Sequence, residues 1–306
     1  MTSANEKAKL AGFDPQTDAG PEKIPVSVVI AVRNEEKNIV GCLESIADFD
    51  QAFVVDSGSS DQTCALAEDL GATVAQFEYD GGWPKKRNWA LQNLPIRNDW
   101  VLILDGDERV TPELQESIAK ATQQTKVNGF YTRWKFMFLG RWMKHSWAHG
   151  WMLRLIRLGK GEYEDLGMRG QGGWDNEVHE NVVVEGKCEQ LNGYLLHESN
   201  EDLEFWIRKQ NEFSTWNAVR RGRQFAEGFP PISHLLSGDA VKKRKWLKAL
   251  FLRLPFKPTI VFLWLYVVKF GFLDGKAGFY FCRLRAMHEL NIQAKIFELH
   301  LSAQQD

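Results

Sequence analysis

Apolar and polar residues alternate in blocks along the first half of the chain. Four short apolar runs, rich in β-branched residues, predict strands at residues 26–32, 53–56, 72–77 and 100–104. The mixed stretches between them predict helices at residues 35–48, 61–70 and 83–94. Strands that alternate with helices indicate βαβ crossovers. The expected fold class is therefore α/β, with a mostly parallel sheet and flanking helices.

The second half of the chain has a different pattern. Residues 129–197 are rich in Gly and Trp and predict short strands and turns, including residues 152–158 and 182–184. Helical patterns follow at residues 201–227 and 276–301. Three regions are therefore expected: a polar, disordered lead-in over residues 1–23, an α/β domain over 24–200 and a helical region over 201–306. The lead-in does not read as a signal peptide.

Composition narrows the possible classes of protein. With 44% hydrophobic and 25% charged residues, the 306-residue chain has the balance of a folded protein with a substantial core. A net charge of -2 gives no global argument for nucleic-acid binding. The four cysteines are scattered, with no Cys-x-x-Cys pair, which argues against zinc and disulfides and favours a reducing compartment.

Two carboxylates follow the fully apolar fourth strand. Asp105 and Asp107, separated by Gly106, come directly after Leu104. In sheets of this class, ligands bind beyond the carboxyl ends of the strands. Two carboxylates at this spacing can present oxygens to one hard divalent cation. The ordinary alternative is an Asp-Gly-Asp turn, but the position at a strand end favours the metal site.

Three further polar motifs lie at strand or helix ends. Residues 33–36 (Arg-Asn-Glu-Glu) follow the first strand, and residues 56–61 (Asp-Ser-Gly-Ser-Ser-Asp) follow the second. The second motif suits a capped turn, and its Asp56 could also accept hydrogen bonds from a nucleoside. Residues 85–88 (Lys-Lys-Arg-Asn) place cations at a helix start, which suits a diphosphate. A solvated helix face is the alternative there.

Together these motifs resemble the family 2 glycosyltransferases, which have the GT-A (nucleotide-diphospho-sugar transferase) fold. The resemblance covers roughly residues 25–200 and rests on residues 33–36, 54–61, 86–88 and 100–108. Within the family, the chain looks like the lipopolysaccharide-core β-glucosyltransferase-like branch. That branch shares the Asp-x-Asp-Glu motif, a later Val-His-Glu and a C-terminal Gly-Phe-Leu-Asp-Gly, here residues 271–275.

The resemblance implies a site for a nucleotide-sugar donor, with UDP as the expected nucleotide and Mg or Mn on its diphosphate. The residues that would contact this donor are Arg33, Glu35, Asp56, Ser57, Lys86, Arg87, Asn88, Asp105 and Gly106. The residues that would hold the metal are Asp105, Asp107 and, approaching from the far side of the domain, His197. Many members of the family have a second acidic residue where this chain has Ser57, so the usual base contact of that residue is not implied here.

Residues 177–180 (Glu-Val-His-Glu) are the candidate acid–base centre. An inverting transfer needs one base to take the proton of the acceptor hydroxyl as its oxygen attacks the anomeric carbon. Glu180 is the first candidate and Glu177 the second. In an alternating strand His179 points away from Glu180, so the two reach one site only if the strand bends.

The sequence of the C-terminal third gives an expectation for the cellular location of the protein. Residues 258–268 are almost wholly apolar but shorter than the roughly 20 residues that span a bilayer. They are flanked by Lys257 and Lys269 and preceded by a basic cluster at residues 242–245. This pattern suits a helix lying in a membrane interface, and thus a peripheral protein on the inner face of the cytoplasmic membrane. A buried core helix is the alternative.

The function expected is an inverting, non-processive transfer of a sugar to an acceptor hydroxyl in cell-envelope glycolipid or polysaccharide synthesis. Expected partners are the nucleotide-sugar, a glycolipid or lipid-linked saccharide and a membrane surface, with no nucleic acid. The main alternative is a non-catalytic, membrane-associated nucleotide-binding scaffold of the same fold. A soluble glycosyltransferase is a second alternative. A processive synthase is disfavoured because no Gln-x-x-Arg-Trp element is present, and a nucleotidyltransferase because residues 33–35 are not a glycine-rich phosphate loop.

Overall fold

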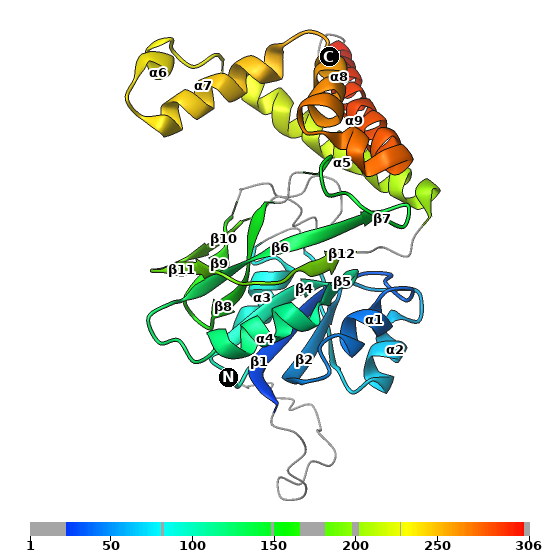
Figure 1. Cartoon of the computed structure of the whole chain (residues 1–306), viewed down its shortest axis with the longest axis vertical. Coiled ribbons are helices and arrows are strands. Elements are labelled where there is room, and N and C mark those ends of the chain that lie inside the picture. Colours follow the sequence, from blue (N-terminus) through cyan, green and yellow to red (C-terminus); the bar gives the residue numbers. More distant parts are fainter. Residues whose placement is uncertain are drawn as a thin grey trace, which may run out of the picture.

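The computed structural model describes residues 23–80, 83–147, 150–165, 181–197, 202–226 and 228–302. Its centre is one curved sheet, with a group of helices from the C-terminal third at one end of it (Figure 1). In spatial order, the main path of the sheet is β3 (Thr73–Gln76), β2 (Phe49–Asp56), β1 (Ile24–Val32), β4 (Trp100–Asp105), β8 (Trp151–Arg157), β6 (Gly129–Phe138), β12 (Leu195–His197) and β5 (Glu108–Val110).

The first four strands of this path are parallel, and β8 runs antiparallel between β4 and β6. Beyond it, β12 is parallel to β6 and antiparallel to β5. Three pairings complete the strands: β7 (Arg141–Trp142) and β11 (Cys188–Gln190) on β6, and β9 (Gly161–Tyr163) with β10 (Val182–Val184). The predicted α/β class with a mostly parallel sheet is confirmed.

Both faces of the parallel strands are buried, which explains their almost continuous apolar sequences. Along β4, Leu102 and Leu104 belong to one core cluster, whereas Val101 and Ile103 belong to the other. Successive side chains of a strand point to opposite faces, so this alternation assigns each cluster to one face. Helices α1 (Ile39–Glu44), α2 (Thr63–Asp69) and α4 (Pro112–Ala121) pack on the first face, and α3 (Lys86–Asn93) packs on the second.

Three predicted helices have different bounds in the structure. The helix expected over residues 35–48 is only α1, because Phe49 already pairs with Ile24 as part of β2 and residues 35–38 form a turn. The helix expected from residue 83 begins at Lys86, since Lys85 is extended. The apolar run 258–268 is not one α-helix: α8 (Lys257–Leu263) continues as the π-helical segment η1 (Trp264–Val268).

The C-terminal region is helical, as predicted. Its remaining elements are α5 (Leu203–Ala226), α6 (Ser233–Leu236), α7 (Ala240–Arg253), the 3-10 segment η2 (Gly271–Asp274) and α9 (Gly275–Ser302). Helices α5 and α9 pack along each other, and Arg221 of α5 makes a two-point ion pair with Glu289 of α9 at 2.6 and 2.8 Å. Helix α7 projects to one side of this group (Figure 1).

Two contacts fix the helical region to the sheet. An aromatic cluster joins Phe281 of α9 to Phe136 and Phe138 of β6, with ring centroids 5.7 and 5.4 Å apart. The buried carboxylate of Asp274 accepts hydrogen bonds from the backbone of His145 and from both the backbone and hydroxyl of Ser146, which follow β7. Motion of these helices would therefore disturb β6 and the loop after β7.

Within the described residues, no single helix has the length and apolar character needed to cross a membrane. Helix α7 and residues 257–268 together have the length and apolar composition of a membrane-crossing segment. The two parts are bent by 115° at the break between them.

Candidate active site

The loops after β1 and β2 are tied together at the carboxyl edge of the sheet. The Asn34 side chain accepts a hydrogen bond from the backbone of Ser60 (2.8 Å), and the Asn34 backbone donates to the Ser59 hydroxyl (2.8 Å). The backbone of Glu35 donates to the Thr63 hydroxyl at 2.8 Å. Asn34 has a φ of 55°, a left-handed conformation that asparagine tolerates better than most residues. The two loops thus form one wall, and Arg33 is exposed on it.

Asp56 shapes the second of these loops. One carboxylate oxygen accepts hydrogen bonds from the backbone of Gly58 (3.0 Å) and Ser59 (2.9 Å), and the other accepts from the Ser59 hydroxyl. Its neighbour Ser57 donates from its backbone to the carbonyl of Val32 at 3.2 Å. Asp56 therefore has a clear structural role, and its contact with a nucleoside stays a prediction.

The three residues that open α3 face different partners. Lys86 is buried and donates to the carbonyl of Val32, at the end of β1, at 3.0 Å. Arg87 makes an ion pair with Asp105. Asn88 is buried and exchanges hydrogen bonds of 2.8 and 2.9 Å with both backbone groups of Tyr163 in β9. Asn88 thus anchors β9 through both ends of its amide, and its contact with the donor stays a prediction.

Asp105, at the end of β4, lies between two arginines. One carboxylate oxygen contacts Arg87, and the other contacts Arg154 of β8 at 2.9 Å. Burial raises the pKa of Asp105, but the two guanidinium groups outweigh burial and hold this pKa well below its usual range. Asp105 is therefore a carboxylate at any physiological pH, with its charge already balanced by the protein.

Glu108 is the fully buried partner of the same arginine. Its carboxylate accepts hydrogen bonds from Arg154 (2.7 Å), from the indole of Trp134 and from the backbone of Asp105 (2.9 Å). Burial raises the pKa of Glu108 to about 7, although Arg154 acts in the opposite direction. Arg154 thus bridges two carboxylates and fixes the Asp-Gly-Asp-Glu segment against β8.

Asp107 lies beside His197, with Oδ2 3.4 Å from Nε2. The pairing of β12 with β5 and β6 sets His197 opposite Glu108 on one side and Phe136 on the other. The His197 ring packs between Trp134 and Phe136, at centroid distances of 4.9 and 5.4 Å. Residues 90 positions apart in the chain therefore meet at the site through sheet pairing.

Glu35 approaches the same segment from the first loop. A Cβ on Gly106 would lie 2.9 Å from the Glu35 side chain, so only glycine fits at this position. Burial, followed by the negative charge of Asp107, raises the pKa of Glu35 to about 7. The positive charge of Lys209, on α5, lowers this pKa, which places the first helix of the C-terminal region within electrostatic reach of the site.

The residues present fit a divalent cation in part. Asp107 and His197 offer an oxygen and a nitrogen close enough to share one ion, and the Nδ1 atom of His197 is buried without a hydrogen-bond partner. Both carboxylate oxygens of Asp105 already make ion pairs, one with Arg87 and the other with Arg154. Among the described residues, no group of three His, Cys, Asp or Glu side chains is arranged around one metal position. Further positions would fall to water and substrate oxygens, as is usual for Mg.

Comparison with known proteins settles the family. The family model for glycosyl transferase family 2 matches residues 27–174. An uncharacterized glycosyltransferase of Rickettsia felis is 37% identical over 212 residues, which are 66% of this chain and 72% of that protein. The chain belongs to glycosyltransferase family 2. Its sheet, with the two loops and the Asp-x-Asp segment at the carboxyl edge, is the GT-A fold expected for this family.

Two further proteins are similar to this glycosyltransferase, over very different shares of the chain. The lipopolysaccharide core biosynthesis glycosyltransferase LpsC of Rhizobium meliloti is 29% identical over 286 residues, which cover 91% of this chain and 94% of LpsC. Among solved structures, mannosyl-3-phosphoglycerate synthase from Rubrobacter xylanophilus matches with a TM-score of 0.32 and 25% identity, over 36% of this chain and 40% of that one.

The structure brings most of the predicted donor and metal residues of this glycosyltransferase to one edge of the sheet. The proposed acid–base residues Glu177, His179 and Glu180 lie outside the described residues, so their placement stays a prediction. Sequence reasoning did not assign Arg154 or Glu108 to the site. The sequence signal for Arg154 was its position inside the apolar strand 152–158. A buried charge without a partner is costly there, so a nearby carboxylate could have been expected.

We expect Arg154→Met to lower the free energy of unfolding of this glycosyltransferase by about 3–5 kcal/mol, because it leaves the fully buried Glu108 without its cation and the half-buried Asp105 with Arg87 alone. Chemical denaturation monitored by circular dichroism measures this effect. The matched control is Arg157→Met on the same strand, since Arg157 pairs at 3.5 Å with the exposed Asp99. The control should cost about 1 kcal/mol.

Adding Glu108→Gln to Arg154→Met should recover part of the lost stability, because the neutral amide no longer needs a cation. Equal costs for Arg154→Met and Arg157→Met would contradict the bridging role of Arg154.

Proposed function

We propose that this glycosyltransferase moves a sugar from a UDP-linked donor to an acceptor hydroxyl with inversion, one sugar per acceptor. The observation that carries the proposal is the arrangement at the end of β4. There Asp107 meets His197 at 3.4 Å, Asp105 is held by Arg87 and Arg154, and the loops after β1 and β2 form the adjoining wall. The site combines carboxylates for a cation with cations for a diphosphate.

In this proposal Asp107 and His197 hold Mg or Mn. When bound, the ion neutralises charge that develops on the departing diphosphate. Arg87 stands at the start of α3, where backbone N–H groups also point outward, and is placed to contact donor phosphate. Asp105 keeps Arg154 as its partner if Arg87 turns to the donor. Glu35, on the first loop, and Asp56, on the second, remain candidates for the nucleoside side of the pocket.

The transfer itself needs a base on the acceptor side. We assign this role to Glu180, with Glu177 as the second candidate, on the sequence pattern alone. The carboxylate takes the hydroxyl proton as the acceptor oxygen bonds to the anomeric carbon. The bond from that carbon to the diphosphate oxygen breaks at the same time, and the nucleoside diphosphate leaves with the electron pair.

The acceptor class follows from similarity over almost the whole chain. LpsC, whose name assigns it to lipopolysaccharide core biosynthesis, is similar along 94% of its length, including the helical region. We therefore assign this chain to the synthesis of a cell-envelope glycolipid, with the lipid-linked saccharide as acceptor.

Location at a membrane surface is part of the same proposal. Large apolar side chains are exposed along the second half of the helical region. Those between residues 256 and 280 are Phe256, Ile260, Leu263, Trp264, Val267, Val268, Phe270, Phe272, Leu273, Phe279 and Tyr280. The basic residues 242–245 are exposed on α7, before this surface. Apolar and basic groups together suit the inner face of the cytoplasmic membrane.

Asp107→Ala should reduce sugar transfer by about 10²-fold or more while the protein stays folded, because the proposed metal ion loses the carboxylate that lies beside His197. Radiolabelled donor and membrane glycolipid measure the rate, and removal of divalent ions with EDTA should reproduce the loss in the unmodified protein. Asp99→Ala, at the opposite end of β4, is the control and should keep full activity. Full turnover by Asp107→Ala would remove the metal assignment.

Glu180→Gln should lower kcat by about 10²–10⁴-fold and leave donor affinity unchanged, since a base acts on the acceptor rather than on the nucleotide. Steady-state kinetics and donor titration separate the two effects. The same measurement on Glu177→Gln decides between the candidates: a loss there, with normal turnover by Glu180→Gln, would move the base to Glu177.

Replacing the four basic residues 242–245 by glutamate should weaken binding to vesicles with 30% anionic lipid by about 10²-fold or more, at about 1 kcal/mol per basic residue. Co-sedimentation measures binding, and vesicles of neutral lipid alone provide the control. Unmodified protein that stays in the supernatant with both kinds of vesicle would contradict the membrane assignment.

A further inference from the structure

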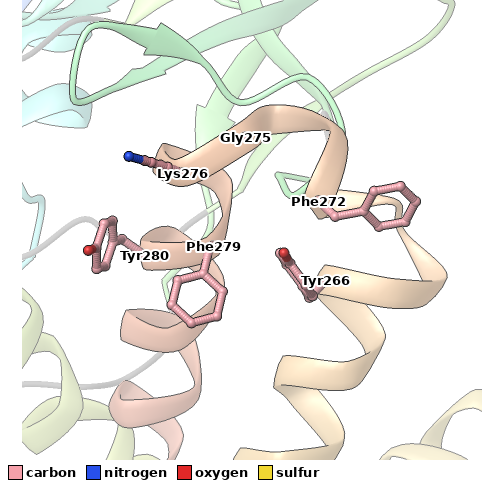
Figure 2. Close-up of a pocket in the computed structure, with 6 residues that line it drawn as sticks. All are labelled: Tyr266, Phe272, Gly275, Lys276, Phe279 and Tyr280. Atoms are coloured by element: carbon pink, nitrogen blue, oxygen red, sulfur yellow. The ribbon is translucent and has the colours of Figure 1, made fainter.

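A pocket of about 420 Å³ opens between the last helical segments. Figure 2 shows the residues that line it, which come from η1, η2 and the first turns of α9: Tyr266, Phe272, Gly275, Lys276, Phe279 and Tyr280. Four of the six are aromatic. The pocket is therefore a hollow with ring walls, on the helical region rather than at the edge of the sheet.

Two backbone features create this hollow. Gly275 has a φ of 69°, a left-handed conformation that lets the chain turn from η2 into α9. Gly278 lies so close to η2 that a Cβ would come within 2.3 Å of the carbonyl of Gly271. The tight approach holds the Tyr266 ring edge-on to Phe272 and Phe279, at centroid distances of 6.2 and 5.6 Å. The pocket walls are thus set by packing.

The lining combines aromatic rings with polar groups, and cations lie at its margin. Lys276 is exposed, and in Figure 2 its ammonium group and the Tyr280 hydroxyl lie on the same side of the pocket. The Arg283 guanidinium lies over the Phe279 ring, 5.8 Å from its centre. Next to the pocket, Phe270 and Leu273 are 55% and 52% exposed. A ligand of this hollow therefore needs an apolar part and a negative charge.

Helix α9, whose first turns line the pocket, also packs on the strand beside the proposed metal site. Phe281 directly follows the lining residues Phe279 and Tyr280 on α9, and its ring packs on Phe136 at 5.7 Å. Phe136 in turn packs on His197 at 5.4 Å. Two successive ring contacts thus connect the helix that lines the pocket to the residue beside Asp107.

We propose that this pocket binds the anionic lipid part of the acceptor: an acyl chain lies against the rings, and Lys276 contacts its phosphate. This inference rests on the proposed transfer to a lipid-linked saccharide and names the place where the lipid is held. A saccharide fits the lining less well, because the six residues offer only two hydroxyls and one ammonium group in their side chains. The bound lipid positions the acceptor hydroxyl near Asp107 and His197.

Calorimetric titration of the full chain with lysophosphatidic acid, below its critical micelle concentration, tests the proposal. This probe has one acyl chain and one phosphate. Monoacylglycerol lacks the phosphate and glycerol 3-phosphate lacks the chain, so both should bind at least tenfold more weakly. Equal binding of glycerol 3-phosphate and lysophosphatidic acid, or no binding of the latter, would overturn the assignment.

Phe279→Asp should weaken binding of lysophosphatidic acid by about tenfold or more, because it places a carboxylate in the apolar wall. Phe297→Asp is the matched control and should bind normally. It makes the same change at a 65% exposed ring on the same helix, eighteen residues or about 27 Å further along. Lys276→Glu, at an exposed position, should weaken binding of lysophosphatidic acid but not of monoacylglycerol. Equal losses in the Phe279 and Phe297 variants would reject the pocket.

Transfer to a lipid-free acceptor saccharide keeps this test separate from that of the proposed function. Phe279→Asp should keep the rate on the lipid-free acceptor and raise KM about tenfold for the lipid-linked one. If the lipid-free acceptor is used but lysophosphatidic acid does not bind, the pocket assignment alone fails. If lysophosphatidic acid binds but no acceptor is glycosylated, the proposed function fails, and with it the link between pocket and acceptor.

Discussion

The site depends on positive charge at the end of β4, where Arg154 is buried and Arg87 also contacts Asp105. Within four residues after the core of β4, the chain carries Asp105, Asp107 and Glu108, and such a density of carboxylates at a buried strand end repels itself unless positive charge is supplied. Arg154 supplies it from the neighbouring strand, in contact with Asp105 at 2.9 Å and Glu108 at 2.7 Å. Asp107 is then left to face His197. The antiparallel insertion of β8 beside β4 is what makes this neutralisation possible.

The same arrangement connects the site to the helical region. Trp134 and Phe136, on β6, enclose the His197 ring, and Phe136 continues into the aromatic cluster around Phe281 of α9. Asp274 adds a polar contact through three hydrogen bonds from His145 and Ser146. The C-terminal helices therefore pack against β6, the strand whose side chains enclose His197. Similarity to LpsC likewise runs through both regions of the chain.

Much of this architecture was predictable from the sequence, and its limits have physical causes. Buried parallel strands such as β1 and β4 are recognisable because both faces are apolar, and the Asp-x-Asp segment is recognisable because it ends one of them. Arg154 was not assigned, because its partners lie 46 and 49 positions away and only strand pairing brings them together. The anchoring of β9 by Asn88 was not predicted either, since its partner Tyr163 lies 75 positions away.

The most direct test of the account is a thermal-shift screen of the full chain against nucleoside diphosphates and nucleotide-sugars, each with and without Mn. If Asp107 and His197 hold a metal ion for the donor diphosphate, one class of nucleotide, uridine above the others, should stabilise the protein only when the metal is present. Stabilisation of equal size without metal would contradict the account and favour a nucleotide-binding scaffold of the same fold.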